Sequence, residues 1–319
     1  MSLLNIATSA SAVLGALFFT SKLLQALDLL WTFIRPCSLS RYAHTTDGRP
    51  PWALVTGATG GIGGELSHQL AQQGFNVILH GRTPSKLEAL KEELEKTYPQ
   101  REFRALVIDV GGKAALGDQA ERKRILASLE DINLTVVVNN AGGATDRTIT
   151  TLDKHSPERV IYDTSVNALF PLQLTHITLP LLIHNSPSLI LNIGSLGDLG
   201  LLLCGSYAAS KLFLSRLSEV INEEMKLTGR DVEVLCVKVA NVVGTGQSIE
   251  EGKGVLKPDA RTAARAVLAR VGCGKGSVVG YWAHAVQAEV IMMMPVWVRR
   301  KVFADIARGM QTEGAVKEE

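Results

Sequence analysis

The sequence has few cysteines, few aromatic residues and almost no excess charge. Its 319 residues carry 33 basic against 31 acidic side chains, a net charge of +2, and only 5% are aromatic. Such a chain lacks the basic field that neutralises a phosphate backbone, so a nucleic acid is not an expected partner. The absence of any CxxC spacing argues against a disulfide framework or a zinc site and favours a reducing compartment. The four cysteines lie at positions 37, 204, 236 and 273.

The seven histidines lack the spacing of a metal site. They include no HExxH motif and no pair four residues apart, the arrangement that puts two imidazoles on one helix face. We therefore expect no metal ion. With 46% apolar residues, the chain is long enough for one large domain and an appendage.

The N-terminal part of the chain is strongly apolar. Residues 1–21 carry no charge, and apolar residues continue beyond Lys22 to about position 34. About 20 apolar residues are needed to cross a bilayer, and several Ser, Thr and Asn residues dilute this run. It can therefore span a membrane, lie on its surface or pack on the protein's own core. A cleaved secretory signal is disfavoured because no Lys or Arg precedes the apolar run.

The first positive charges follow this apolar run, at Lys22, Arg35, Arg41 and Arg49. By the positive-inside rule, they predict that the bulk of the protein faces the cytosol. The polar stretch that ends in Arg-Pro-Pro cannot continue a helix. We therefore expect a membrane-associated segment at 1–40, a linker at 41–51, the main domain at 52–285 and a C-terminal amphipathic or lid segment with its tail at 286–319.

From residue 52 onward, short apolar segments alternate with amphipathic ones. Strands are predicted at 52–56, 76–80, 103–110, 135–139, 189–193, 232–239 and 277–280. Helices are predicted at 62–73, 85–98 with Ser85 as cap, 119–129, 158–184, 207–228 and 259–271. Nearly continuous apolar strands separated by helices are typical of a parallel sheet covered on both faces. We therefore predict an α/β Rossmann domain, doubly wound, with about seven parallel strands.

A glycine-rich turn lies between the first predicted strand and the first predicted helix. It runs from Thr56 and Gly57 to Gly61, Ile62 and Gly63. Glycines let backbone N–H groups approach a pyrophosphate, and the positive end of the following helix stabilises its charge. A bare GxGxxG also occurs in tight turns that bind nothing, but its position after the first strand favours a dinucleotide.

The end of the second predicted strand indicates which dinucleotide is bound. It reads His80-Gly81-Arg82, without the Asp or Glu that would contact a ribose 2′-hydroxyl. Arg82 can instead form charge-assisted hydrogen bonds with a 2′-phosphate, which favours NADP(H) over NAD(H). The alternative is that Arg82 is a solvated side chain before a helix.

A phenol and an ammonium group share one face of a predicted helix. Tyr207 and Lys211 are four residues apart. A nearby ammonium favours the phenolate, which would bring Tyr207 closer to acid–base use at neutral pH. Ser195 follows a predicted strand at its carboxyl end, where parallel sheets bind ligands, and its hydroxyl can hold a carbonyl oxygen.

Together these motifs make residues 50–285 resemble the short-chain dehydrogenase/reductase family. The family's cofactor motifs are matched by Thr56, Gly57, Gly61 and Gly63, by the adenine-contacting Asp109, and by Asn139, Asn140, Ala141 and Gly142. After the sixth strand the family usually shows Pro-Gly and then a Thr at the nicotinamide, whereas this chain has Val239-Ala240-Asn241 and Thr245. This departure leaves a non-catalytic NADP-binding scaffold as an alternative.

The resemblance also implies a catalytic tetrad, which falls on Asn167, Ser195, Tyr207 and Lys211. In the family's scheme Tyr207 passes the proton and Ser195 positions the substrate oxygen. Lys211 binds the nicotinamide ribose and tunes Tyr207, and Asn167 holds a water that links Lys211 to solvent. The helices that carry Asn167 and Tyr207 pair subunits in many relatives, which implies a possible homodimer.

Within the family, the chain resembles the membrane-bound branch of 17β-hydroxysteroid dehydrogenases and very-long-chain 3-oxoacyl-CoA reductases. The apolar N-terminus and the segments 74–77, 82–87 and 281–286 carry this resemblance. It implies NADPH-dependent reduction of a ketone to a secondary alcohol at the endoplasmic reticulum membrane. A long-chain 3-oxoacyl-CoA is the first expected substrate, and a steroid, sterol, terpenoid or polyketide is the alternative.

Two further apolar segments are consistent with a hydrophobic substrate. Residues 196–204 are apolar for a loop, and residues 286–298 contain three consecutive Met residues before a basic run. Adaptable Met side chains suit a lid over a lipid pocket or a membrane-surface helix. Burial of 196–204 in the core or against a second subunit, and ordinary core packing of 286–298, are the alternatives. Pro295 predicts a break in any helix through the second segment.

Overall fold

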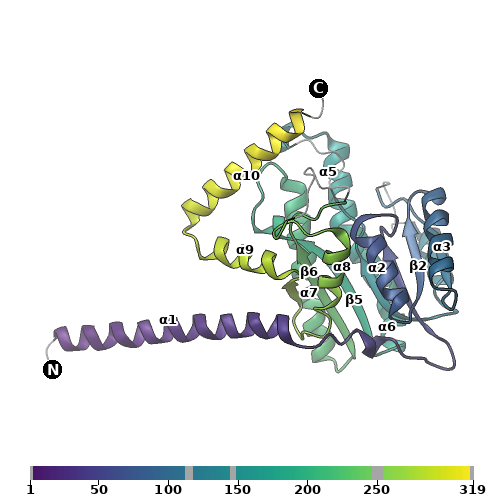
Figure 1. The fold of residues 1–319 in the computed structure, drawn as a ribbon, viewed down its shortest axis with the longest axis horizontal. Coiled ribbons are helices and arrows are strands. Elements are labelled where there is room, and N and C mark those ends of the chain that lie inside the picture. Colours follow the sequence, from purple (N-terminus) through teal and green to yellow (C-terminus); the bar gives the residue numbers. More distant parts are fainter. Residues whose placement is uncertain (1–2, 112–117, 144–148, 246–253, 317–319) are drawn as a thin grey trace.

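The computed structural model describes residues 3–111, 118–143, 149–245 and 254–316, and its core is one parallel sheet (Figure 1). The strand order is β3-β2-β1-β4-β5-β6-β7, and every neighbouring pair is parallel. The strands are β1 (Pro51–Thr56), β2 (Asn76–Gly81), β3 (Phe103–Val107), β4 (Asn133–Asn139), β5 (Ser188–Ser195), β6 (Val232–Val239) and β7 (Ser277–Val279). The predicted doubly wound Rossmann sheet is confirmed.

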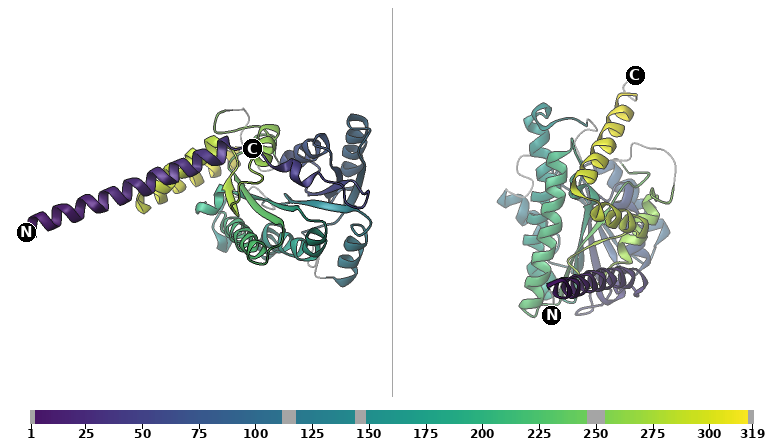
Figure 2. Two further views of the ribbon diagram at one scale, coloured as in Figure 1. Left: turned by 90° about the horizontal axis from the view of Figure 1, so that it is seen from below. Right: turned by 90° about the vertical axis from the view of Figure 1, so that its left-hand side faces the viewer.

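Helices cover both faces of this sheet (Figure 2). Along β1, Ala53 and Val55 point into one core, whereas Trp52 and Leu54 point into the other, as the alternation of a strand requires. On the first face lie α2 (Gly61–Gln72), α3 (Pro84–Thr97) and α8 (Ala260–Leu268). On the second face lie α4 (Gln119–Ala127), α5 (Pro157–Thr164), α6 (Phe170–His184) and α7 (Gly205–Leu227).

Several predicted boundaries differ from the structure. The single helix expected at 158–184 is divided by a π-helical turn, η3 (Ser165–Leu169), between α5 and α6. Helix α3 begins at Pro84 with Thr83 as its cap residue, so the predicted cap, Ser85, lies inside the helix. Proline at the first helical position has the φ that a helix needs and no N–H to satisfy, and it therefore sets the start. Strand β3 also ends at Val107 rather than at residue 110.

The segment expected to be a linker packs against the domain. A short helical turn, η1 (Leu39–Tyr42), buries Tyr42, whose hydroxyl donates to Glu233 of β6 over 2.5 Å. Farther on, Asn133 Nδ2 donates to the carbonyl oxygen of His44 over 2.9 Å. The chain therefore enters the domain along the amino edge of the sheet, opposite the edge that binds ligands in this fold.

Three helices at the chain ends project from one side of the domain (Figures 1 and 2). They are α1 (Leu3–Ile34), α9 (Trp282–Met293) and α10 (Val296–Val316). The last two meet at Pro295, as predicted. Ser11–Ile34 of α1 is long and apolar enough to cross a membrane, with a mean hydropathy of 1.5, and only its last part, around Asp28 and Thr32, contacts the domain. Pro157–His184 also meets that criterion but is half buried in the domain core.

Candidate active site

The glycine turn lies at the carboxyl edge of the sheet and leads into α2. Gly57 and Gly61 have φ angles of +64° and +55°, which favour glycine. A Cβ on Gly63 would lie 2.2 Å from the carbonyl oxygen of Gly57, so only glycine lets helix and strand approach this closely. Thr245, far along the chain, lies beside the turn, with its Cγ2 3.4 Å from where a Cβ of Gly61 would be. Ile62 is buried in the core behind the turn.

Thr56 and Asn140 hold the glycine turn against the end of β4. The Thr56 hydroxyl accepts the N–H groups of Asn140 and Ala141, each over 2.9 Å, and donates to the carbonyl oxygen of Val138. The Asn140 amide donates to the carbonyl oxygens of Thr56 and Gly57. The two side chains therefore shape the turn. The sequence marked Asn140 only as part of a motif, because a bond to a neighbouring strand has no local signal.

The side chain of Asn139 is not directed at the ligand edge. It is 1% exposed, and its Nδ2 donates to Asn192 over 2.7 Å and to Thr175 over 3.3 Å. Any contact of Asn139 with a cofactor therefore involves its backbone.

Arg82 stands exposed where β2 ends, and its guanidinium donates to the Tyr162 hydroxyl over 3.4 Å. Asp109, also exposed, follows β3 and accepts the N–H of Gly111. Beneath them His80 stacks on Phe170, and burial lowers the pKa of His80 to about 4. The Asp109 carboxylate and the Arg82 guanidinium are therefore accessible to a ligand, whereas the buried His80 imidazole is uncharged at neutral pH.

Tyr207 and Ser195 come together at the same edge of the sheet. Tyr207 lies in the first turn of α7, and Ser195 is the last residue of β5. Both side chains lie against Gly197, where a Cβ would be 3.2 Å from Ser195 Oγ and 3.4 Å from Tyr207 Cε1, and the Ser195 hydroxyl accepts the N–H of Gly197 over 3.0 Å. A carbonyl oxygen placed beside both hydroxyls would receive two hydrogen bonds.

Lys211 and Asn167 meet at Gly142, one helical turn from Tyr207. The Lys211 Nζ donates to the carbonyl oxygen of Ile193 over 3.0 Å and lies 5.8 Å from the centre of the Tyr207 ring. A Cβ on Gly142 would lie 2.7 Å from Asn167 Oδ1 and 3.0 Å from Lys211 Nζ, so a glycine is required between them. The four predicted catalytic side chains therefore lie in one cluster.

Asn167 sits inside the π-helical turn η3. Its amide donates to the carbonyl oxygens of Gly143 and Asp163, each over 2.8 Å, and its Oδ1 accepts the N–H of Gly143. The wider turn redirects one residue out of the α-helical pattern, and such turns are frequent at functional sites. Sequence periodicity could not have shown it, because the apolar residues on either side keep nearly helical spacing.

The protonation of the Tyr207–Lys211 pair differs from the sequence expectation. Burial raises the pKa of Tyr207, and Ser195 only partly opposes this effect. Burial also lowers the pKa of Lys211 to about 8. The expectation that the ammonium makes the phenol more acidic was therefore wrong for the protein without cofactor. Desolvation is the largest cause of the raised pKa, so Tyr207 is protonated at neutral pH.

The end of β6 is held by a histidine from α9. Val239, the last residue of the strand, is buried beside Ser195 in the register of the sheet. The N–H of the next residue, Ala240, donates to His284 Nδ1 over 3.1 Å. Because Nδ1 accepts, Nε2 carries the proton and donates to the carbonyl oxygen of Leu256 over 3.2 Å. The imidazole therefore connects the active edge of the sheet to residues 254–257.

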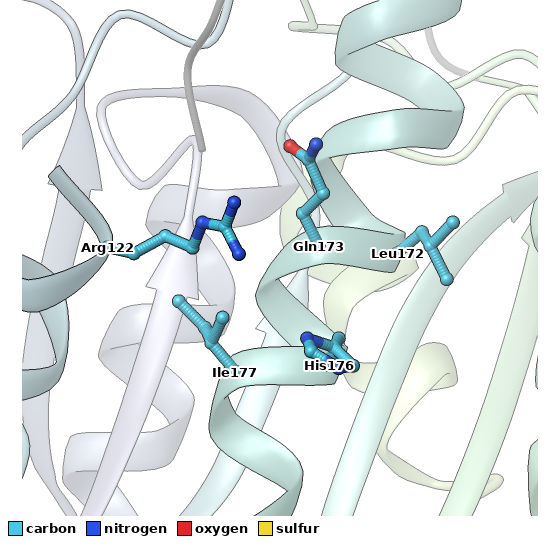
Figure 3. A pocket seen from close by; sticks show the side chains of 5 residues that line it. All are labelled: Arg122, Leu172, Gln173, His176 and Ile177. Carbon is cyan, nitrogen blue, oxygen red and sulfur yellow. The ribbon is translucent and has the colours of Figure 1, made fainter. Parts of the chain in front are cut away.

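An apolar groove adjoins this histidine. It has a volume of about 400 Å³ and lies between residues 255–256, α9 and α10, and its lining includes Leu256, Trp282, Val286, Val290, Val302 and Ile306. A second cavity, of about 290 Å³, lies between α4 and α6 and contains none of the predicted site residues (Figure 3). Within the described ranges, no group of three His, Cys, Asp or Glu side chains is placed to hold a metal ion.

A doubly wound sheet with a glycine turn at its switch point and a Tyr–Lys pair at the same edge defines a dinucleotide-binding oxidoreductase. The chain belongs to the short chain dehydrogenase family, whose family model matches residues 51–253. The family resemblance seen in the sequence is therefore confirmed.

Relatives and solved structures agree with this assignment. A very-long-chain 3-oxoacyl-CoA reductase of Caenorhabditis briggsae is 30% identical over 91% of this chain and 88% of its own length. The corresponding protein of Aspergillus fumigatus is 31% identical over 88% and 81%. A short-chain dehydrogenase from Sphingobium yanoikuyae in complex with NADPH has the same fold, with a TM-score of 0.64, 22% identity and coverage of 80% and 96%. A serine dehydrogenase complexed with NADP+ is 31% identical, with a TM-score of 0.52 and coverage of 60% and 73%.

Proposed function

We propose that this protein reduces the ketone of a long-chain 3-oxoacyl-CoA to a secondary alcohol with NADPH. The observation that carries the proposal is the neighbouring Tyr207–Ser195 pair at the edge of the sheet that carries the glycine turn, with Lys211 and Asn167 close to it. The relatives named very-long-chain 3-oxoacyl-CoA reductase support the substrate class. The family relation and the solved structure with NADP+ support the cofactor.

The carboxyl edge of the sheet fits a phosphorylated dinucleotide. The turn at Gly57 and Gly61 together with the start of α2 would hold the pyrophosphate. Exposed Arg82 would hold the 2′-phosphate and Asp109 the adenine. The expected contacts at the nicotinamide end are Ala141, Gly142, Val239 and Thr245, together with Tyr207 and Lys211. Bound NADPH supplies the hydride.

Each of the four catalytic side chains would then have its own role in the reduction. Ser195 and Tyr207 hold the ketone oxygen, which fixes the carbonyl carbon for reduction. Tyr207, whose raised pKa keeps it protonated, gives its proton to that oxygen. Lys211 holds the ribose and returns a proton to Tyr207. Asn167, bonded to Gly143 and Asp163, would position a water that links Lys211 to solvent.

The apolar groove supports a fatty acyl substrate. Apart from Gln287, its walls from α9 and α10 are apolar, and His284 connects Leu256 in its lining to Ala240 at the end of β6. Ser195 pairs with Val239 in the sheet register, and Ala240 is the next residue along the chain. The His284 side chain therefore joins the groove to the edge of the sheet that carries Ser195. We infer that the hydrocarbon chain leaves the active site through this groove.

We also infer attachment to the endoplasmic reticulum membrane, with the catalytic domain facing the cytosol. Helix α1 exposes a continuous apolar surface that includes Phe19 and Trp31. At the elbow between α9 and α10, Met293 and Trp297 are 72% and 74% exposed and precede the basic residues 299–301. Because α1 and the elbow project from one side of the domain (Figure 2), one membrane could hold both.

A homodimer would cover the outer face of α7. Leu212, Phe213 and Val220 are between 41% and 50% exposed there. Grouped exposed apolar side chains are typical of protein–protein contact surfaces. Sedimentation of the detergent-solubilised protein tests this. A monomer at all concentrations would contradict the proposed pairing.

The substrate assignment is tested with 3-oxoacyl-CoAs of increasing chain length and with keto-steroids. We expect kcat/KM to rise with chain length. The variant Val290→Trp, which fills the groove, should reduce kcat/KM for the longest chain at least about tenfold and leave short chains unchanged. Leu227→Trp, at an 88% exposed position at the end of α7, is the matched control. A preference for keto-steroids, or equal loss at every chain length, would contradict the assignment.

A further inference from the structure

A largely buried ion pair involves the segment that follows Ser195. Lys238 of β6 and Asp198, in the short helical turn η4 (Leu196–Leu199), approach to 2.8 Å between Nζ and Oδ2. The Asp198 side chain is 1% exposed and that of Lys238 is 19% exposed. The turn η4 belongs to the segment that joins Ser195 to Tyr207, so Asp198 lies between these two residues in the chain.

The backbone of β5 is shaped to let Lys238 reach this turn. Gly194 and Lys238 are partners in the β5–β6 register. A Cβ on Gly194 would lie 3.1 Å from Lys238 Cγ and 2.7 Å from the sulfur of Cys236. The aliphatic part of Lys238 therefore occupies the space that the missing side chain leaves, and its ammonium group emerges at Asp198.

The ion pair acts on the hydroxyl pair through one residue, Gly197. Its N–H donates to the Ser195 hydroxyl over 3.0 Å. A Cβ at this position would lie 3.2 Å from Ser195 Oγ and 3.4 Å from Tyr207 Cε1. Because Asp198 is the next residue in the chain, holding its carboxylate also holds Gly197 against both side chains.

A buried ion pair is a poor source of stability, since apolar side chains of the same size would serve as well or better. Its place next to Gly197, which contacts both Ser195 and Tyr207, therefore points to positioning. We propose that Asp198 and Lys238 are positioning residues that hold the Ser195–Tyr207 segment in its reactive geometry and balance the charge beneath the phenol. This inference rests on the proposed function only for the identity of the reaction.

Several groups face the phenol and set its protonation. Burial is the largest cause of the raised pKa of Tyr207. Ser195 lowers this pKa, and Cys204 and Asp198 raise it further. Lys211 lies on the same helix face as Tyr207. From β6, Lys238 compensates the Asp198 charge, and Cys236, whose pKa burial raises to about 12, stays uncharged. Removing either member of the ion pair therefore leaves an unbalanced charge near the phenol.

The two single variants consequently have opposite expected effects. Asp198→Asn removes a negative charge and leaves the ammonium, so the pKa of Tyr207 should fall. Lys238→Met leaves the carboxylate alone, so that pKa should rise. The double variant has no unbalanced charge and should titrate between the two single variants. A role limited to packing would not produce shifts of opposite sign.

The test is an ultraviolet titration of tyrosinate in the full-length, detergent-solubilised protein without substrate. Each variant is compared with its own Tyr207→Phe derivative, so that the difference reports Tyr207 alone. Asp131→Asn, which breaks an exposed ion pair with Arg104 of similar length, is the matched control and should leave the titration unchanged. Shifts of opposite sign support the proposal, and an absent shift or shifts of the same sign overturn it.

Kinetics supply a second readout. With a 3-oxoacyl-CoA, Lys238→Met should lower kcat about tenfold to a hundredfold with little change in KM, because the carbonyl binds but is misaligned. Lys238→Arg should restore most of the rate. If Lys238→Met does not fold, the double variant provides both readouts without an unpaired buried charge. If no substrate in the panel is reduced by the wild type, the proposed function fails, while the titration still decides the role of the ion pair.

Discussion

Replacing Lys211 by methionine should stabilise the protein without cofactor at neutral pH while abolishing turnover. Burial lowers the pKa of Lys211 from 10.5 to about 8, so at neutral pH the fold holds a buried charge. The difference of about 2.5 corresponds to about 3 kcal/mol of destabilisation. Methionine removes that charge but leaves the carbonyl oxygen of Ile193 without its 3.0 Å hydrogen bond, which costs about 1–2 kcal/mol. The expected net gain is about 1–2 kcal/mol.

The stability gain of Lys211→Met should depend on pH. Because the pKa of Lys211 is lower in the folded than in the unfolded protein, the folded state binds fewer protons between about pH 8 and 10.5. The wild type therefore gains stability as the pH rises through this range. The advantage of Lys211→Met should be full below about pH 8 and should turn into a small deficit towards pH 10.5, where only the lost hydrogen bond to Ile193 remains.

Urea unfolding of the detergent-solubilised protein, followed by tryptophan fluorescence at about pH 7 and about pH 10, measures both effects. Lys226→Met is the matched control, because Lys226 lies on the same helix with its side chain 49% exposed. It should produce no gain at either pH. If Lys211→Met is less stable than the wild type at neutral pH, or if its gain does not decline with rising pH, then the ammonium is not destabilised by burial.

Three other outcomes follow from the site. Gly63→Ala would put a methyl group 2.2 Å from the carbonyl oxygen of Gly57, so it should lower the free energy of unfolding by about 2–3 kcal/mol and weaken NADPH binding, as urea unfolding and fluorescence titration will show. Arg82→Leu should raise the Kd of NADPH about 10- to 100-fold and that of NADH much less, and equal effects would exclude a 2′-phosphate contact. His80, with its pKa lowered to about 4 by burial, should destabilise the wild type as the pH falls from about 6.5 to 4, and His80→Gln should show a flatter profile of unfolding free energy across that range.

Much of the fold follows from local patterns that the sequence shows directly. Apolar runs such as Trp52–Thr56, followed at once by glycines, predicted both the strand and the turn, because each depends on residues close together in the chain. The break at Pro295 was predictable for the same reason, since proline removes a donor from the helix. The lateral order of the strands was not predicted, because no local pattern shows which strands lie side by side.

The features that the sequence did not reveal depend on contacts between distant segments. The π-helical turn at Asn167 is stabilised by the backbone of Gly143, and the ion pair of Asp198 joins a turn to a strand forty residues later in the chain. The protonation of Tyr207 was mispredicted because a four-residue spacing shows that an ammonium is near but not how deeply both groups are buried. Desolvation is a property of the assembled site.

The most direct test of the central claim compares the wild type with Tyr207→Phe. NADPH consumption with a long-chain 3-oxoacyl-CoA and the Kd of NADPH are measured for both proteins. If Tyr207 donates the proton to the ketone oxygen, the variant should bind NADPH as the wild type does and consume it about 10²- to 10⁴-fold more slowly. Consumption by the variant at the rate of the wild type would contradict the assignment of Tyr207 as the acid.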